Sequence, residues 1–129
     1  HIGTVAVTVI MGETLDTITH ACAIVKKLNV ACIKHITSEY LMTNSLYEIL
    51  VQLYRSDTSA IILESIENIV GYNPLNGLCN NETLQVIYSL VNKITDKSKS
   101  INVIITTKNK GLCEKMFTGC DILYIDEIN

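Results

Sequence analysis

The sequence TVAVTVIMGETLDTIT, residues 4–19, contains the first regular element of the chain and the turn that follows it. Residues 4–11 are rich in β-branched side chains and end at Gly12, which predicts a buried strand that runs into a turn. After the turn, apolar residues recur at helical spacing from Ile18 to Leu28. Lys26 and Lys27 stand where the helix macrodipole favours cations. A strand, a short turn and an amphipathic helix are therefore expected in that order.

The rest of the chain repeats this alternation. Strands are predicted at residues 30–36, 59–64, 101–107 and 122–125, and helices around residues 46–54, 84–94 and 112–117. Residues 71–81, GYNPLNGLCNN, contain the only proline and two of the six glycines, which predicts a loop. Strands alternating with helices predict an α/β fold, with a five-stranded parallel sheet covered by helices on both faces and joined by right-handed crossovers. Residues 1–129 are expected to form a single domain.

Composition restricts the class of protein. The 129 residues are 48% hydrophobic and 18% charged, which excludes a disordered chain, and no apolar run approaches the ~18 residues of a membrane span. A net charge of −3 and a single arginine, Arg55, provide no basic surface for nucleic acid. No signal peptide precedes the first apolar run, so a cytoplasmic location is expected.

The five cysteines are an odd number without a Cys-x-x-Cys pair. They are interpreted mainly as small apolar side chains, and Cys22 and Cys32 are expected to be buried, reduced thiols. No metal site is assigned to the cysteines or to the three histidines.

Ligands of open α/β sheets bind at the carboxyl ends of strands, and the turn after the first strand has the length of a phosphate loop. Residues 12–19 match the pattern G-x-x-x-x-G-K-[ST] only at Gly12 and Thr19, a match that arises often by chance. Residues at the ends of two later strands strengthen the phosphate-loop interpretation. Glu64 ends the third strand where a Walker B acid belongs, and Thr106 and Thr107 end the fourth strand at the place of a sensor residue.

Four segments, CIKHITSEYLM, SAIILESIENIVGY, NETLQVIYSLVNKI and NVIITTKN, together resemble the second AAA ATPase domain of the vesicle-fusing ATPases, the N-ethylmaleimide-sensitive fusion protein family. The resemblance runs from about residue 12 to residue 129 and is clearest between residues 32 and 116. It implies a P-loop NTPase-like three-layer sandwich, the large subdomain of an AAA module without its helical lid. It also implies ATP and Mg²⁺ as cofactors and a homo-hexamer that reaches SNARE complexes through the SNAP adaptor by means of other domains. The location implied is cytoplasmic and peripheral to membranes, without direct insertion.

The resemblance also implies roles for particular residues. Magnesium ligands are expected at Thr19 and Glu64, and catalytic functions at Glu64, Ser65 and Thr107. The cofactor-binding phosphate loop corresponds to Gly12, Glu13, Thr14, Leu15, Asp16, Thr17, Ile18 and Thr19.

Several of these positions depart from the family pattern. Ile18 stands where the family has a lysine that reaches the β- and γ-phosphates, and Thr17 replaces a glycine. Serine at position 65 is a poor base for activating water. The segment before the last strand has no arginine to act as a finger, and lysine lacks the planar fork. Asp16 is expected to cap the helix in place of a phosphate, and Glu67 to be a solvent-facing acid.

Three functions are compatible with these residues. The leading hypothesis is a degenerate ATPase domain that supports hexamer assembly rather than hydrolysis. The alternative is a functional ATP-binding domain with weak ATPase activity, in which backbone amides, Thr19 and Glu64 hold Mg-ATP as a glue between subunits. A receiver-like signalling domain would require clustered aspartates at the first and third strand ends, where only Glu64 fits.

Overall fold

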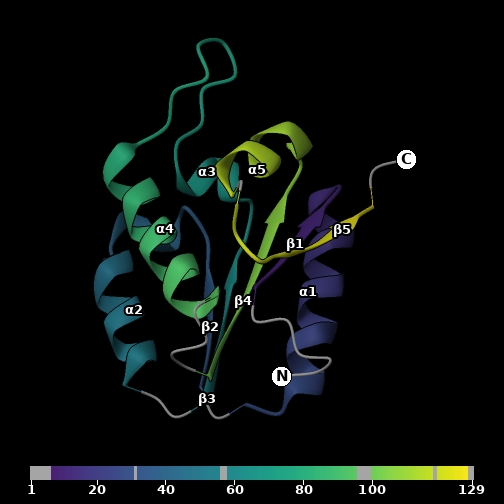
Figure 1. The fold of residues 1–129 in the computed structure, drawn as a ribbon, viewed down its shortest axis with the longest axis vertical. Helices are drawn as coiled ribbons and strands as arrows, with labels where there is room; N and C mark the ends of the chain where they lie inside the picture. The colour runs from purple at the N-terminus through teal and green to yellow at the C-terminus, as the bar shows by residue number, and fades with distance from the viewer. Residues whose placement is uncertain (1–6, 31, 56–57, 96–99, 118, 128–129) are drawn as a thin grey trace.

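A parallel β-sheet forms the middle layer of the molecule (Figure 1). The structure is a computed structural model that describes residues 7–30, 32–55, 58–95, 100–117 and 119–127. Its strands are β1 (Val7–Met11), β2 (Cys32–Ile36), β3 (Thr58–Leu63), β4 (Ser100–Thr107) and β5 (Leu123–Asp126). Its helices are α1 (Thr14–Leu28), α2 (Leu46–Tyr54), α3 (Ile66–Ile69), α4 (Asn81–Thr95) and α5 (Lys110–Met116), with a 3₁₀ turn, η1 (Tyr40–Met42), before α2.

The five strands are arranged in the order β2-β3-β4-β1-β5, and every neighbouring pair is parallel. The predicted α/β fold, a P-loop-like three-layer sandwich with a five-stranded parallel sheet, is thus confirmed. Flavodoxin-like sheets, the class that includes receiver domains, have the order 2-1-3-4-5. The observed order therefore excludes the receiver-like alternative.

Alternate residues of the central strands β1, β3 and β4 pack into two separate apolar clusters. On one face Ile10 of β1 packs with Ala21 and Val25 of α1, which is the helix that covers this side. On the other face Val9 and Met11 join the larger cluster, to which α2, α3, α4 and α5 contribute. Figure 1 shows α1 on one side of the sheet and α2 and α4 on the other. Because both faces are covered, the central strands are buried and read as nearly continuous apolar runs in the sequence.

Most element boundaries lie within a few residues of the predicted ones. The predicted strand residues 4–6 lie outside the described residues. Helix α1 begins at Thr14, about four residues before the predicted start, and ends at Asn29, whose left-handed conformation (φ 50°) closes the helix. Residues 71–80 form the predicted loop, which projects beyond the sheet and helices (Figure 1). Within the described ranges, none of the helices is long and apolar enough to span a bilayer.

The cysteines are all free thiols in very different surroundings. The expectation of burial is wrong for Cys22, which is exposed because it points away from the sheet-facing row of α1 that contains Ala21 and Val25. Cys32 is half-buried. Cys113 of α5 is fully buried, and burial, followed by the nearby charges of Glu67 and Glu114, raises the pKa of its thiol from 9.0 to about 12.

The raised pKa of Cys113 predicts a loss of stability in alkaline solution. Above pH 9.0 the thiol ionises in the unfolded chain and stays protonated in the folded one, so the unfolded state is favoured progressively up to about pH 12. We expect this residue to remove about 1.4 kcal/mol of unfolding free energy per pH unit in that window. Urea titrations of the wild type and Cys113→Ala between pH 8 and 10.5 measure the difference. Equal slopes for the two proteins would contradict the assignment.

Candidate functional site

The carboxyl edge of the sheet is the place where a ligand of this fold would bind. From β1 the chain crosses by α1 toward β2, whereas from β4 it crosses by α5 to β5 on the opposite side, so the strand order reverses between β1 and β4. Ligands of open α/β sheets bind outside the carboxyl ends of the strands at such a point. Met11 pairs with Thr107 in the register of β1 and β4, which places Gly12 and Lys108 at this crevice.

The connection between β1 and α1 is much shorter than predicted. It consists of Gly12 and Glu13, because α1 starts at Thr14. The N–H of Thr17 donates to the carbonyl of Glu13 at 2.9 Å, the first turn of a regular helix. The remaining predicted phosphate-loop residues, 14–19, are therefore helical, and the expectation that residues 12–19 form a loop of phosphate-binding length is corrected. A phosphate loop needs several non-helical residues whose N–H groups surround the phosphates.

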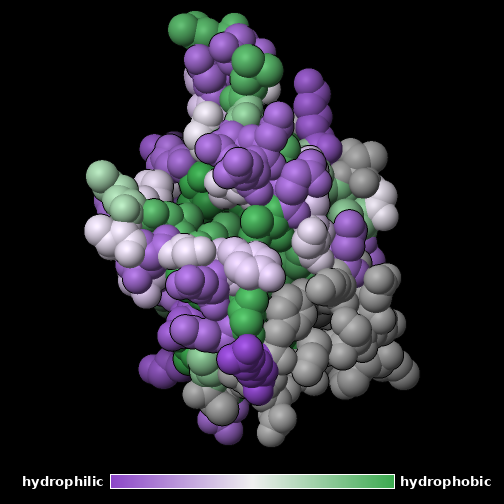
Figure 2. Space-filling model, turned by 90° about the vertical axis from the view of Figure 1, so that its left-hand side faces the viewer, coloured by the Kyte–Doolittle hydropathy of each residue, from purple (hydrophilic) through white to green (hydrophobic). Residues whose placement is uncertain are grey.

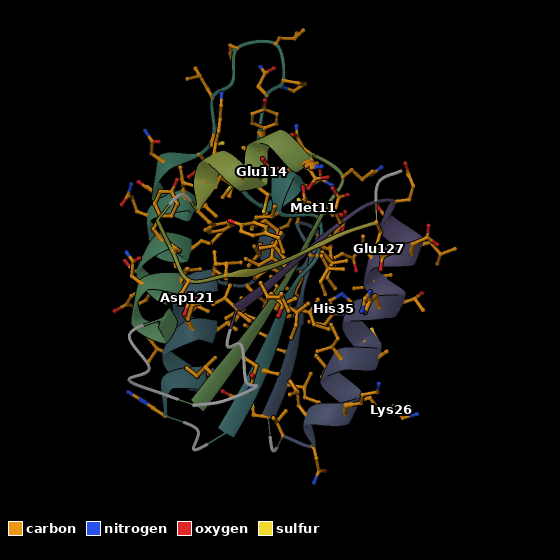
Figure 3. All side chains as sticks on the ribbon, turned by 45° about the vertical axis from the view of Figure 1, so that its right-hand side comes forward. Met11, Lys26, His35, Glu114, Asp121 and Glu127 are labelled. Atoms are coloured by element: carbon orange, nitrogen blue, oxygen red, sulfur yellow. The ribbon has the colours of Figure 1, made fainter. Side chains whose placement is uncertain are left out.

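The space in front of Gly12 is filled by the protein itself. A Cβ atom at this position would lie 3.1 Å from Cβ of Glu127 and 3.2 Å from Cγ2 of Thr17. The N–H of Gly12 donates to the carbonyl of Thr107 at 2.9 Å, and the N–H of Glu127 donates to the carbonyl of Met11 at 2.7 Å. Met11 and Glu127 are labelled in Figure 3, near the end of β1. Glycine is needed here for close packing between protein segments.

The other residues of the predicted phosphate loop are engaged within α1 or exposed. Thr17 is 1% exposed and its hydroxyl donates to the carbonyl of Thr14. The hydroxyl of Thr19, a predicted magnesium ligand, is on the exposed surface and donates to the carbonyl of Leu15 at 2.8 Å. Ile18 is half-buried against the cluster under α1. Leu15 is 76% exposed.

Asp16 is not the helix cap that the sequence suggested. The cap position is occupied by Glu13, and no side chain bonds to the helix N-terminus there. Asp16 lies in the first turn of α1, exposed to solvent. Its negative charge still interacts favourably with the helix dipole, by about 0.3–1 kcal/mol. The reason for the difference is the earlier helix start, which moves Asp16 from the cap into the helix.

Glu64, expected to bind magnesium and to take part in catalysis, is directed toward the outer edge of the sheet. Its carboxylate lies 2.7 Å from Nε2 of His35 in β2, and its N–H donates to the carbonyl of Ile36. Since β2 lies on the far side of β3 from β1, this pairing turns the carboxylate away from the crevice. Among the described residues no group of three or more His, Cys, Asp and Glu side chains is arranged to hold a metal ion.

Ser65 and Thr106 are bonded to each other at the ends of β3 and β4. Ser65 has a left-handed backbone (φ 53°), and its N–H donates to Oγ1 of Thr106 at 2.9 Å. A non-glycine residue in this conformation costs about 1–3 kcal/mol, which the surrounding contacts must offset. Ser65 is 7% exposed, so the residue at the expected position of the catalytic acid is buried.

Glu67 is the site residue whose position the sequence did not reveal. It was expected to face solvent, but Oε1 accepts the hydroxyl of Thr107 at 2.8 Å and Oε2 accepts the N–H of Lys108 at 3.0 Å. Thr107, the predicted sensor, is 1% exposed and also accepts the N–H of Asn109. The sequence feature that could have indicated this role is the position of Glu67 in the first turn of α3, shortly after β3 ends at the carboxyl edge.

Two contacts between a basic and an acidic side chain lie at the end of the last strand. His20 of α1 pairs with Glu127, with 2.5 Å between Nδ1 and Oε1. Lys110 of α5 pairs with Asp126 of β5, and the hydrogen bond that the lysine donates to this carboxylate raises its pKa. The first contact joins Glu127, the residue after β5, to α1, and the second joins β5 to α5. Both contacts lie at the carboxyl edge of the sheet, where Glu127 also packs against Gly12.

An open hollow of about 510 Å³ lies beside this network. Glu67, Tyr72, Lys108 and Lys110 are among the residues that line it. No protein-family model matches the chain.

The first test concerns the packing at Gly12. We expect Gly12→Ala to lower the free energy of unfolding by about 1–3 kcal/mol, because the added methyl group must displace Thr17 and Glu127. Gly111→Ala is the matched control, since a Cβ there meets only Oδ1 of Asn109 at 3.8 Å. Urea denaturation of both variants measures the effect. A Gly12→Ala protein as stable as the wild type would show that the space is open.

The second test concerns the hydrogen bonds of half-buried Glu67 to Thr107 and Lys108. We expect Glu67→Ala to lower the unfolding free energy by about 1.5–3 kcal/mol, because Thr107 and the N–H of Lys108 lose a charged acceptor. The control is Glu48→Ala, an exposed acid in the first turn of α2, with an expected change within about 0.5 kcal/mol. Thermal or urea unfolding distinguishes the two. Equal effects would mean that Glu67 is an ordinary surface acid.

Proposed function

We propose that this chain is a degenerate AAA-type ATPase domain of a vesicle-fusing ATPase, and that it supports assembly of the homo-hexamer rather than hydrolysis of ATP. In this proposal other domains of the protein reach SNARE complexes through the SNAP adaptor. The observation that carries the loss of hydrolysis is the two-residue β1–α1 connection, with Thr17 and Glu127 packed against Gly12. A triphosphate needs that space and the backbone N–H groups around it.

Three further features support loss of the chemistry. Ile18 provides no charge for the β- and γ-phosphates. Glu64 is paired with His35, so its carboxylate is directed away from the crevice where Mg²⁺ would be held. The only arginine, Arg55, follows α2 just before β3 begins, at the amino edge of the sheet and thus opposite to the site. Each feature removes a separate part of the phosphoryl-transfer machinery.

The assembly role is supported by what remains. The three-layer fold is intact, with a continuous apolar core on each face of the sheet. Large apolar side chains are nevertheless exposed, among them Met42 at 82% and Tyr47 at 65%. In this proposal such side chains contribute to the contacts between subunits. A domain that keeps its fold and its contact surfaces can hold a ring together without hydrolysing nucleotide.

The alternative, a nucleotide that glues subunits together, has one observation in its favour. The hollow of about 510 Å³ at the carboxyl edge is lined by Lys108 and Lys110, two cations close to the end of β4. Lys110 is already paired with Asp126, however, and Glu67 lines the same hollow with a negative charge. The electrostatic attraction for a polyphosphate is correspondingly reduced. We therefore place this function second.

Isothermal titration of the chain with Mg-ATP separates the two proposals. We expect no saturable binding below millimolar ATP and no phosphate release above the uncatalysed rate. The Lys108→Ala variant is the control for weak binding in the hollow, and it should behave as the wild type does. Saturable micromolar binding that Lys108→Ala abolishes would overturn the assembly-only proposal and establish nucleotide binding at this edge.

A further inference from the structure

The loop between α3 and α4 contains the one asparagine of the chain that is followed by a glycine, Asn76 before Gly77. Residues 71–80, GYNPLNGLCN, carry no charged side chain. The loop stands out at the top of the molecule in Figures 1 and 2, and both Asn76 and Gly77 are exposed. The two residues therefore lie in solvent rather than against the sheet or the helices.

An asparagine followed by glycine is reactive, because the main-chain nitrogen of the second residue lies within reach of the side-chain amide carbon of the first. Attack of that nitrogen closes a five-membered imide ring, and a side chain on the second residue hinders the attack. Glycine has no side chain to do so. Among the described residues, apart from its two chain neighbours, no atom would lie within 4 Å of a Cβ placed on Gly77, whereas at Gly12 the nearest lies at 3.1 Å. The structure thus leaves room for the ring.

Hydrogen bonding orients the side chain of Asn76 for this reaction. Its Oδ1 accepts the N–H of Leu78 at 2.9 Å, which directs the amide group toward the main chain of the turn and makes its carbon more electrophilic. Within the described part of the chain, no hydrogen bond holds Nδ2, the nitrogen that would leave. The exposed Asn44 differs, since its Nδ2 donates to the carbonyl of Tyr40 and to Oγ1 of Thr43. Of these two exposed amides, only that of Asn76 has a leaving nitrogen that is not held.

A hydrogen bond of the turn restrains the attacking nitrogen. The N–H of Gly77 donates to the carbonyl of Asn73 at 2.7 Å, and this bond must open before the nitrogen attacks. Asn73 fixes the turn by two more bonds. Its N–H donates to the carbonyl of Leu78 at 2.9 Å, and its Oδ1 accepts the N–H of Leu75 at 2.9 Å. The rate of the reaction is therefore set by how often this turn opens.

We propose that Asn76 is a site of spontaneous modification, at which this chain deamidates in water without an enzyme. In the first step the nitrogen of Gly77 bonds to Cγ of Asn76, the Cγ–Nδ2 bond breaks, and Nδ2 leaves as ammonia with the proton of the Gly77 N–H. In the second step one water molecule adds to either carbonyl of the imide and opens the ring. The products are aspartate and isoaspartate at position 76. This inference goes beyond the proposed assembly function and does not depend on it.

The modification changes the loop in two ways. Either product adds a carboxylate to a segment without charged side chains and makes the net charge of −3 more negative by one unit. Isoaspartate also inserts one additional carbon atom into the main chain between residues 76 and 77, which alters the spacing that the 2.7 Å bond between Gly77 and Asn73 requires. The loop of an aged molecule therefore differs from that of a new one in charge and in shape.

Peptide mapping by mass spectrometry of the purified chain, stored folded in neutral and mildly alkaline buffer, tests this proposal. We expect the mass change from amide to acid to appear at Asn76 before any other asparagine, as two chromatographically separate products. The rate should rise about tenfold per pH unit, because the attacking N–H must first lose its proton. Asn76→Gln should lose the modification at this position, since its longer side chain would have to close a six-membered ring. Asn44, exposed and followed by the small Ser45, is the internal control.

A variant of the turn tests the restraint. Asn73→Ala removes the bond to the N–H of Leu75, and we expect modification at Asn76 to become about two- to tenfold faster, because the loss of one hydrogen bond favours opening of the turn. The matched control is Asn80→Ala, which removes a bond of the same kind to the N–H of Thr83 at the base of the loop and should react as the wild type does. Thermal unfolding of each variant verifies that the fold is unchanged. A chain that is modified first at another asparagine, or at Asn76 only after urea has unfolded it, would overturn the proposal. Equal rates for the two variants would overturn the restraint assigned to Asn73.

Discussion

The contact of Gly12 with Thr17 and Glu127 determines what the carboxyl edge of this sheet can do. It lets α1 begin after a connection of only two residues and brings Glu127, the residue after β5, directly against the turn. The N–H of Glu127 then extends the pairing of β5 with β1 by one bond to Met11, and its carboxylate reaches His20. Helix α1 and strand β5 are thus joined at the point where a nucleotide-binding fold keeps an open crevice.

Polar groups along the rest of the carboxyl edge are likewise hydrogen-bonded to other groups of the protein. Ser65 donates to Thr106, Thr107 donates to Glu67, and Glu64 pairs with His35. Buried polar groups are costly unless they are hydrogen-bonded, and ligands or water usually satisfy those of an active site. Here the buried hydroxyls of Thr106 and Thr107 are bonded to the backbone N–H of Ser65 and to the carboxylate of Glu67. This edge is therefore stable without a bound nucleotide, which agrees with the proposed loss of hydrolysis.

The sheet was predictable from sequence because its signals are local. Residues such as those of β3 and β4 form continuous apolar runs, as expected for strands that are covered on both faces. The site was less predictable because its contacts join distant residues. The Glu67–Thr107 bond spans 40 positions and the His20–Glu127 pair spans 107. Asp16 was misassigned for a related reason, since the helix start depends on how closely Gly12 can approach β5.

A fold can keep its core while its ligand site changes, because different interactions maintain the two. The large cluster that contains Val9 and Met11 uses apolar burial between the sheet and the helices, and none of these contacts requires a phosphate or a metal. The site residues, by contrast, would contribute to stability through a ligand only while the ligand is bound. Once the edge is bonded within itself, that contribution is no longer needed.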